Sequence, residues 1–165
     1  MRKKFRLADD SLLHLYGLID LIDDELIKRN YLGFISVSAV TACELAIKEI
    51  FYEFGDDESE LLGTVTRNIF HKINGRIAPN HLYNHISCFG KKYVDIFKER
   101  LRSTNEKTLQ ESGVNIIESY KSLVDCRNRF VHEGEILDTI TYDELKRSYD
   151  SGKSVVHCLS DSMVR

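Results

Sequence analysis

The segment "CRNRFVHEG" (residues 126–134) holds the side chains of this sequence that are best suited to chemistry: Arg127, Asn128 and His132. A histidine exchanges a proton near neutral pH, and an arginine stabilises negative charge that develops on a phosphate. No cluster of carboxylates accompanies them, so the set suits RNA cleavage without a metal ion or cofactor. The nucleophile would be the 2′-hydroxyl of the substrate, and the products would carry 2′,3′-cyclic phosphate and 5′-hydroxyl ends.

The helical spacing of these residues raises a geometric problem. Asn128 and His132 share a face, whereas Arg127 and His132 are five residues apart, about 140° round a regular helix. They converge only through the long arginine side chain, through a helix that loosens before Gly134, or through a second copy of the chain. A two-fold axis beside this helix would bring both copies of the set around one cleft, so a homodimer is expected.

Two charged residues interrupt stripes of apolar residues. Arg127 shares a helical face with Ile117, Tyr120, Val124 and Val131, and Glu44 shares one with Val37, Val40, Ile47 and Phe51. Because a buried charge is costly unless it is paired, Arg127 and Glu44 are expected to face each other or to share a small polar pocket. Replacing Arg127 would then leave Glu44 unpaired and destabilise the fold. The pair either only fixes helix register or also positions Arg127 to bind an anion.

The basic run "KKYVDIFKERLR" (91–102) offers a second candidate surface for RNA. Lys91, Lys92 and Lys98 are interleaved with aromatic residues, a pattern that can guide an RNA backbone toward the cleft. Arg129, within the 126–134 segment, is assigned to RNA binding as well. Two acidic residues break up the charge of the run, so a solvated helix face is the alternative.

Two other patterns contain histidine. His81 and His85 are four residues apart on a predicted helix and could bind a metal ion, but no third ligand is evident, so a packed or solvated pair is favoured. Arg76 and His81 repeat the five-residue spacing of the first set, but this second match spans Pro79. It is expected to lie in a turn and is interpreted as a chance match.

The elements that must position these residues are predicted to be helices, because apolar residues recur with helical spacing and no stretch alternates like a strand. Thr141 and Glu144 form a capping box, and Gly134 suits a helix end. The segment 102–108 is expected to be a polar loop, and Gly90 to bend or interrupt a helix. The fold class is therefore all-α, a bundle of about six helices. The predicted helices cover about 11–29, 35–54, 57–74, 79–101, 108–132 and 142–163.

Composition is that of an ordinary globular protein, with 42% hydrophobic and 30% charged residues, and one domain over residues 1–165 is expected. The net charge of −3 argues against a protein that coats nucleic acid non-specifically but allows a local basic groove. No apolar run approaches the ~20 residues that span a bilayer, and no signal peptide is recognised. The four cysteines form no C-x-x-C pair. A cytoplasmic protein without a membrane partner is expected.

The string "RNRFVH" (127–132) resembles the R-x4-H motif of HEPN domains (higher eukaryotes and prokaryotes nucleotide-binding). Within that superfamily the chain is most similar to the RiboL-PSP-type group, in which the motif also ends a late helix and an early helix carries a glutamate, here in "ACELAIKEIF". The resemblance implies an all-α HEPN-like bundle that acts as a metal-independent ribonuclease and is competent as a dimer. It also implies that Arg127 and His132 are the catalytic pair, with Asn128 beside them and Glu44 as the supporting acid.

The resemblance implies RNA as the substrate, an antitoxin or other protein as a further partner, and a toxin, antiphage or RNA-processing setting. The alternative is a non-catalytic HEPN module that binds a partner protein or nucleotide and retains the motif for structure. A helical protein that binds metal through His81 and His85 is a third hypothesis. Loss of cleavage with a retained fold on replacing His132 would favour the nuclease, whereas the module would show no cleavage at all.

Overall fold

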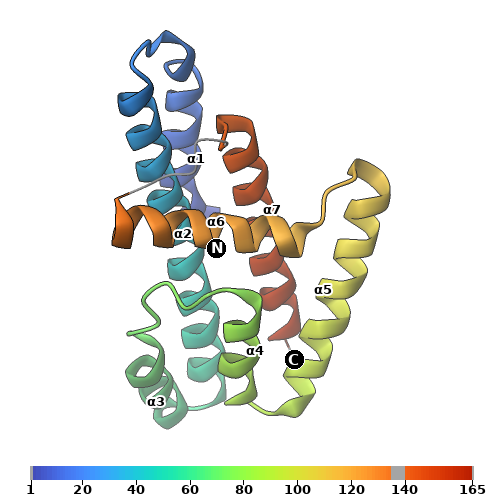
Figure 1. The fold of residues 1–165 in the computed structure, drawn as a ribbon. Helices are drawn as coiled ribbons and strands as arrows, with labels where there is room; N and C mark the ends of the chain where they lie inside the picture. Colours follow the sequence, from blue (N-terminus) through green and yellow to red (C-terminus); the bar gives the residue numbers. More distant parts are fainter. Residues whose placement is uncertain (1, 135–139, 165) are drawn as a thin grey trace.

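The computed structural model describes residues 2–134 and 140–164, and in these ranges it consists of helices joined by turns and loops, with no strand (Figure 1). The all-α prediction is confirmed, although the described chain holds seven α-helices and one short 3₁₀ helix where about six helices were expected. None of these helices is long and apolar enough to cross a lipid bilayer. In chain order they are α1 (Arg2–Tyr16), η1 (Ile19–Leu21), α2 (Glu25–Glu58), α3 (Glu60–Phe70), α4 (Pro79–Ser87), α5 (Lys91–Ser112), α6 (Ile116–Glu133) and α7 (Tyr142–Ser162).

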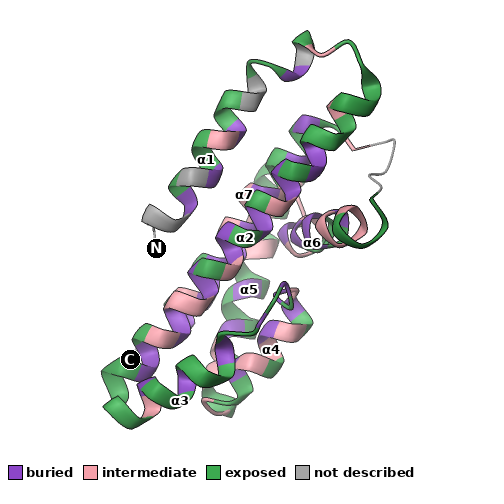
Figure 2. Ribbon diagram, turned by 90° about the vertical axis from the view of Figure 1, so that its left-hand side faces the viewer, coloured by how far each residue is buried: buried purple, intermediate pink, exposed green. Residues whose placement is uncertain are grey.

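Helix α2 is the central element of the fold. Its 34 residues make it roughly 51 Å long, and it packs against α1, α3, α6 and α7. Buried residues occupy more than one of its faces, because neighbours cover it from several sides (Figure 2). Ala39, Cys43, Ala46 and Phe51 are completely buried there.

Helix α6 runs across α2 and α7 rather than along them (Figures 1 and 2). Where it crosses α2, the ring of Phe130 lies on Gly33, and a Cβ added to that glycine would be 2.3 Å from Phe130 Cδ2. Further along α6, Tyr120 is completely buried and its hydroxyl donates to the Ile77 carbonyl at 3.0 Å. Its ring also lies against Gly152 of α7, where a Cβ would approach to 2.9 Å. These contacts hold α6 against α2, α7 and the segment before α4.

The N-terminal half departs from the sequence prediction. One helix was expected over 11–29, but α1 ends at Tyr16 and a new helix begins after Asp24, whose carboxylate accepts two backbone N–H groups of the first turn at 2.9 and 3.1 Å. This helix, α2, also includes Gly33 and extends beyond Gly55, where a helix end was expected. Both glycines remain helical because a neighbouring side chain packs on each of them.

A second departure concerns the segment 102–108, which was expected to be a loop and lies within α5. Its polar side chains support a solvated helix, because the Arg102 guanidinium pairs with Glu99 at 2.7 Å and with Glu106 at 2.8 Å along the same face. The following helix, α6, therefore begins only at Ile116 and not near residue 108.

Local signals in the second half of the chain were interpreted correctly. Gly90, with φ of 119°, separates α4 from α5. Gly134, with φ of 70°, ends α6, and the capping box of Thr141 and Glu144 begins α7. Each of these features depends on residues within one helical turn, which is why the sequence alone predicted them.

Candidate functional site

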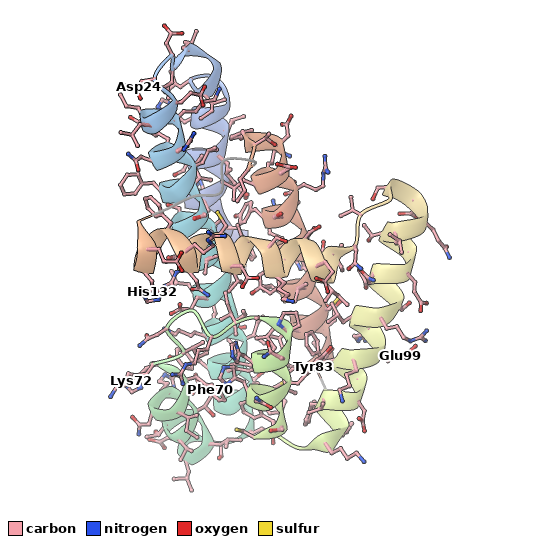
Figure 3. All side chains as sticks on the ribbon, in the orientation of Figure 1. Asp24, Phe70, Lys72, Tyr83, Glu99 and His132 are labelled. Atoms are coloured by element: carbon pink, nitrogen blue, oxygen red, sulfur yellow. The ribbon has the colours of Figure 1, made fainter. Side chains whose placement is uncertain are left out.

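Helix α6, the loop between α3 and α4, and the start of α4 border an open cavity of about 960 Å³, called the motif cavity below. Arg127, Asn128 and His132 line it from α6. The segment 72–83 forms the opposite wall (Figure 3). The three residues of the R-x4-H string therefore share one cavity within a single copy of the chain.

The structure answers how Arg127 and His132 reach the same cavity. Helix α6 remains regular to its C-cap at Gly134, so the helix does not loosen before this glycine. The long Arg127 side chain instead reaches round the helix, and its Nη1 donates to Asn128 Oδ1 at 2.9 Å. Because Asn128 lies one turn before His132, this bond directs the guanidinium toward the face that carries the histidine.

A turn at Asn74 and Gly75 provides the surface on which Arg127 lies. Helix α3 ends at Phe70, so these residues are not its C-terminal end, as had been expected. Both have positive φ, 48° and 79°, and a 3.0 Å backbone hydrogen bond closes the turn. A Cβ at Gly75 would lie 2.8 Å from Arg127 Nη1. Glycine is therefore required both for the backbone conformation and for the approach of the guanidinium.

Glu44 lies on the other side of the same glycine. Its Oε2 accepts the Gly75 N–H at 2.7 Å, and its Oε1 accepts Lys48 Nζ at 2.7 Å. No ion pair joins Glu44 to Arg127 in the described part of the chain, so the prediction of a facing pair is wrong. The alternative of a shared polar site is closer, because both residues contact Gly75. Glu44 thus holds the turn in place, and Lys48, one helical turn away, neutralises its charge.

Burial along α6 decreases toward its C-terminal end. Tyr120 and Val124 are buried, Ile117 and Arg127 are half-buried, and Val131 is 49% exposed. The expected apolar stripe therefore stops before Arg127, which lies at the edge of the core and extends into the motif cavity. Within the described ranges, its Nε is enclosed and has no hydrogen-bond partner.

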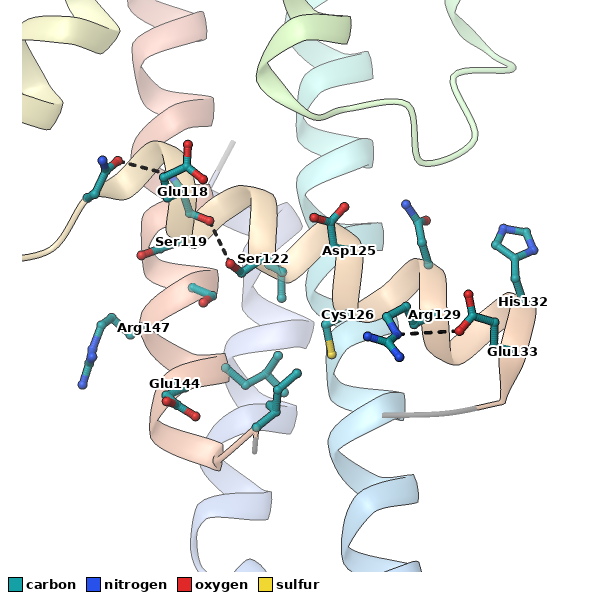
Figure 4. Close-up of a pocket in the computed structure, with 16 residues that line it drawn as sticks. Glu118, Ser119, Ser122, Asp125, Cys126, Arg129, His132, Glu133, Glu144 and Arg147 are labelled. Atoms are coloured by element: carbon teal, nitrogen blue, oxygen red, sulfur yellow. Dashed lines mark hydrogen bonds and ion pairs between the residues drawn. The ribbon is translucent and has the colours of Figure 1, made fainter. Parts of the chain in front are cut away.

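A second cavity of about 800 Å³, called the α6–α7 cavity, lies on the other side of α6 (Figure 4). Three residues border both cavities: Asp125, Asn128 and His132. Cys126 and Arg129 border only the α6–α7 cavity and project to the opposite side of the helix. Arg129 Nε is 3.7 Å from Glu133 Oε2. Arg129 therefore does not join Arg127 in the motif cavity.

One lysine of the basic run of α5 contacts a residue that lines the motif cavity. Lys98 Nζ is 5.3 Å from the centroid of the Tyr83 ring, and Tyr83 lines the cavity. Lys91 and Lys92 are exposed and are not part of its lining, and Lys92 Nζ instead lies 5.5 Å from the centroid of the Tyr93 ring. Of the three lysines assigned to RNA binding, Lys98 alone is connected to the cavity wall in this way.

The second match to the motif spacing lies close to the first. The expectation that this match lies in a turn is wrong, because Arg76 follows the turn at Asn74 and Gly75 and His81 lies in the first turn of α4. Both residues nevertheless line the motif cavity. His85 does not face a metal site, because its Nε2 is 3.0 Å from the Arg76 carbonyl. Among the residues that the structure describes, no three His, Cys, Asp or Glu side chains are grouped as metal ligands.

Two further cations of the motif cavity, Lys72 and Lys121, were missed by the sequence analysis. Lys121 lies seven residues before Asn128 and therefore on the same face of α6, a signal that the sequence does contain. Lys72 follows α3, and nothing local connects it to the segment 126–134.

A family model described as RiboL-PSP-HEPN matches residues 4–165, nearly the whole chain. Neither the curated proteins nor the solved structures contain a match to this chain. The all-helical architecture is consistent with the helical bundle of HEPN domains. The chain therefore belongs to the RiboL-PSP-HEPN family.

Proposed function

We propose that this protein is a metal-independent endoribonuclease whose active site is the motif cavity. HEPN proteins are commonly ribonucleases, which makes this class the first to consider. The observation that carries the proposal is that His132 lines a cavity together with several cationic side chains. Arg127 lies there with three further cations, and Asp125 is the one carboxylate among the lining residues. A proton-transfer group within a cationic cavity suits cleavage of a phosphodiester.

In the proposed reaction, His132 takes the proton of the substrate's 2′-hydroxyl while the 2′-oxygen attacks the adjacent phosphorus. The 2′-O–P bond forms, the P–O5′ bond breaks, and the 5′-oxygen takes a proton from solvent water and leaves as a hydroxyl. Arg127 binds the phosphate oxygens during the attack. Its one hydrogen bond in the described chain, to Asn128, leaves most of its five N–H donors available to a ligand.

The proposal predicts that end-labelled single-stranded RNA is cleaved in the presence of EDTA. The same sequence with 2′-deoxyribose at every position should not be cleaved, because the nucleophile is then missing. Analysis of the products should give 2′,3′-cyclic phosphate and 5′-hydroxyl ends. Cleavage of the deoxy strand, or loss of all activity in EDTA, would contradict this chemistry. If no RNA is cleaved, the non-catalytic binding module becomes the better hypothesis.

The active form is proposed to be a homodimer that joins two motif cavities. Ile27, Tyr31, Phe34 and Leu45 lie on one face of α2 and are all exposed. The Phe34 ring contacts Phe130 of α6, with ring centroids 5.4 Å apart, and the exposed Val131 lies between Phe130 and His132 in the sequence. Exposed apolar surfaces of this kind suit association, and a two-fold axis here would bring the two His132 side chains toward each other.

Phe34→Asp is therefore expected to shift the protein from dimer to monomer and to lower cleavage at least tenfold, because a carboxylate would be desolvated in the interface. Light scattering gives the mass, and the labelled-RNA assay gives the rate. Leu61→Asp is the matched control, because Leu61 is also strongly exposed (76%, against 63% for Phe34) but lies on α3. A Phe34→Asp protein that melts normally, remains dimeric and cleaves normally would rule out this surface as the interface.

A further inference from the structure

The motif cavity extends well beyond the R-x4-H residues. Its α6 wall begins at Ile117 and ends at His132, a distance of about 22 Å along the helix axis. Arg127 and His132 occupy the C-terminal part of this wall. Lys121 lies toward its other end, and Arg76 and His81 line the cavity from the facing segment. The cavity thus contains a second cationic group that the proposed cleavage step does not use.

Two cations of the cavity, Arg76 and Lys121, are not neutralised by a carboxylate in the part of the chain that the structure describes. Elsewhere on this chain, whose net charge is −3, exposed arginines such as Arg67 and Arg102 are paired with carboxylates. Unpaired cations gathered along a cavity in an acidic protein favour a polyanionic ligand.

Two hydrogen bonds to backbone carbonyls hold the segment that carries Arg76 and His81 in place. The Tyr120 hydroxyl donates to the Ile77 carbonyl at 3.0 Å, and the His85 ring donates its Nε2–H to the Arg76 carbonyl at 3.0 Å. Burial lowers the pKa of His85, the hydrogen bond to the Arg76 carbonyl partly opposes this, and the charges of His81 and Arg76 lower the pKa further. The two bonds hold the backbone in place and leave the Arg76 and His81 side chains at the cavity.

We infer that Arg76, His81 and Lys121 form a subsite that binds a backbone phosphate of single-stranded RNA, beyond the phosphate that Arg127 holds. The inference deepens the proposed function and rests on it for the position of the scissile phosphate. A cavity of about 960 Å³ is near the upper end of ordinary ligand pockets, roughly 300–1,000 Å³, so it has room for a few nucleotides of one strand. Phosphate contacts set the register of a strand, so the subsite would determine which linkage reaches His132.

The test measures RNA binding in the absence of cleavage. Fluorescein-labelled single-stranded RNA is titrated with His132→Ala protein, and the anisotropy gives Kd over a range of salt concentrations. Adding Arg76→Ala and Lys121→Ala should weaken binding about tenfold at low salt. The slope of log Kd against log salt should fall by about 1.4, at roughly 0.7 per lost contact with a single strand. A labelled dinucleotide should bind both proteins equally, because it cannot reach from one site to the other.

The matched control removes the same two kinds of charge from other surfaces, on α3 and α5. Arg67→Ala with Lys107→Ala, on the same background, should leave Kd and the salt slope unchanged, because both residues are exposed and lie outside the cavity lining. Equal losses in the two double variants would overturn the subsite in favour of a general charge effect. Failure of the His132→Ala protein to bind any RNA would overturn it as well. If wild type binds in this Arg76- and Lys121-dependent way but cleaves nothing, the subsite stands and the proposed nuclease function fails.

Discussion

His132→Ala is expected to reduce the rate of RNA cleavage by roughly 100-fold or more, the usual worth of a positioned acid–base group. The imidazole borders the motif cavity at the last turn of α6, where it can reach a ribose hydroxyl while Arg127 holds the phosphate. The melting temperature should change little, because His132 is exposed and contributes little to the core. Initial rates on labelled RNA and thermal melts of the same preparations provide both measurements.

His157→Ala is the matched control for this variant. His157 is also exposed, but it lies on α7 and borders neither the motif cavity nor the α6–α7 cavity. Its replacement should leave cleavage unchanged. Full activity of His132→Ala, or an equal loss in both variants, would exclude His132 as the proton-transfer group.

Arg127→Ala is expected to lower cleavage by roughly 100-fold, because one preorganised donor to a developing anionic charge is typically worth that much. Arg127→Lys should recover only part of the rate. The lysine keeps the charge but lacks the forked donors that bind Asn128 and a phosphate oxygen together. The same labelled-RNA assay ranks the three proteins.

The stability of the Arg127→Ala protein distinguishes the observed contacts of Glu44 from the ion pair with Arg127 that the helical spacing predicted. A facing ion pair would make this variant strongly destabilised, whereas the observed geometry leaves Glu44 bound to Lys48 and Gly75. Glu44→Ala should instead be the destabilised variant, by about 2 kcal/mol or more. The substitution leaves the Gly75 N–H without its acceptor and removes the carboxylate that pairs with Lys48, whose side chain is only 15% exposed. Denaturant unfolding measures both variants. A larger loss of unfolding free energy for Arg127→Ala than for Glu44→Ala would instead support an ion pair between these two residues.

The difference between these two expectations follows from the turn at Asn74 and Gly75. Helical spacing correctly suggested that Glu44 and Arg127 belong to neighbouring surfaces. It could not predict that a turn from a third segment would lie between them, because the bond from Gly75 to Glu44 joins residues 31 positions apart. The Asn-Gly dipeptide did signal a change of direction, but its role as the support for Arg127 depends on where the loop packs.

The sequence by itself determined the features that arise within a few residues: the all-helical class, the end of α6 at Gly134, the capping box that begins α7, and the placement of Arg127, Asn128 and His132 in the last turns of one helix. Helix caps and side-chain periodicity act over about one turn, so they can be recognised without the rest of the chain.

Only the tertiary structure decided which residues share a cavity. It directed Arg129 to the opposite side of α6 and brought Arg76, His81 and Lys72 to the cavity that Arg127 also lines. These relations depend on long-range contacts, such as the bond from Tyr120 to a carbonyl 43 residues earlier. Residues that are distant in sequence face each other because buried side chains fix how the helices pack, and no local pattern of residues specifies that packing.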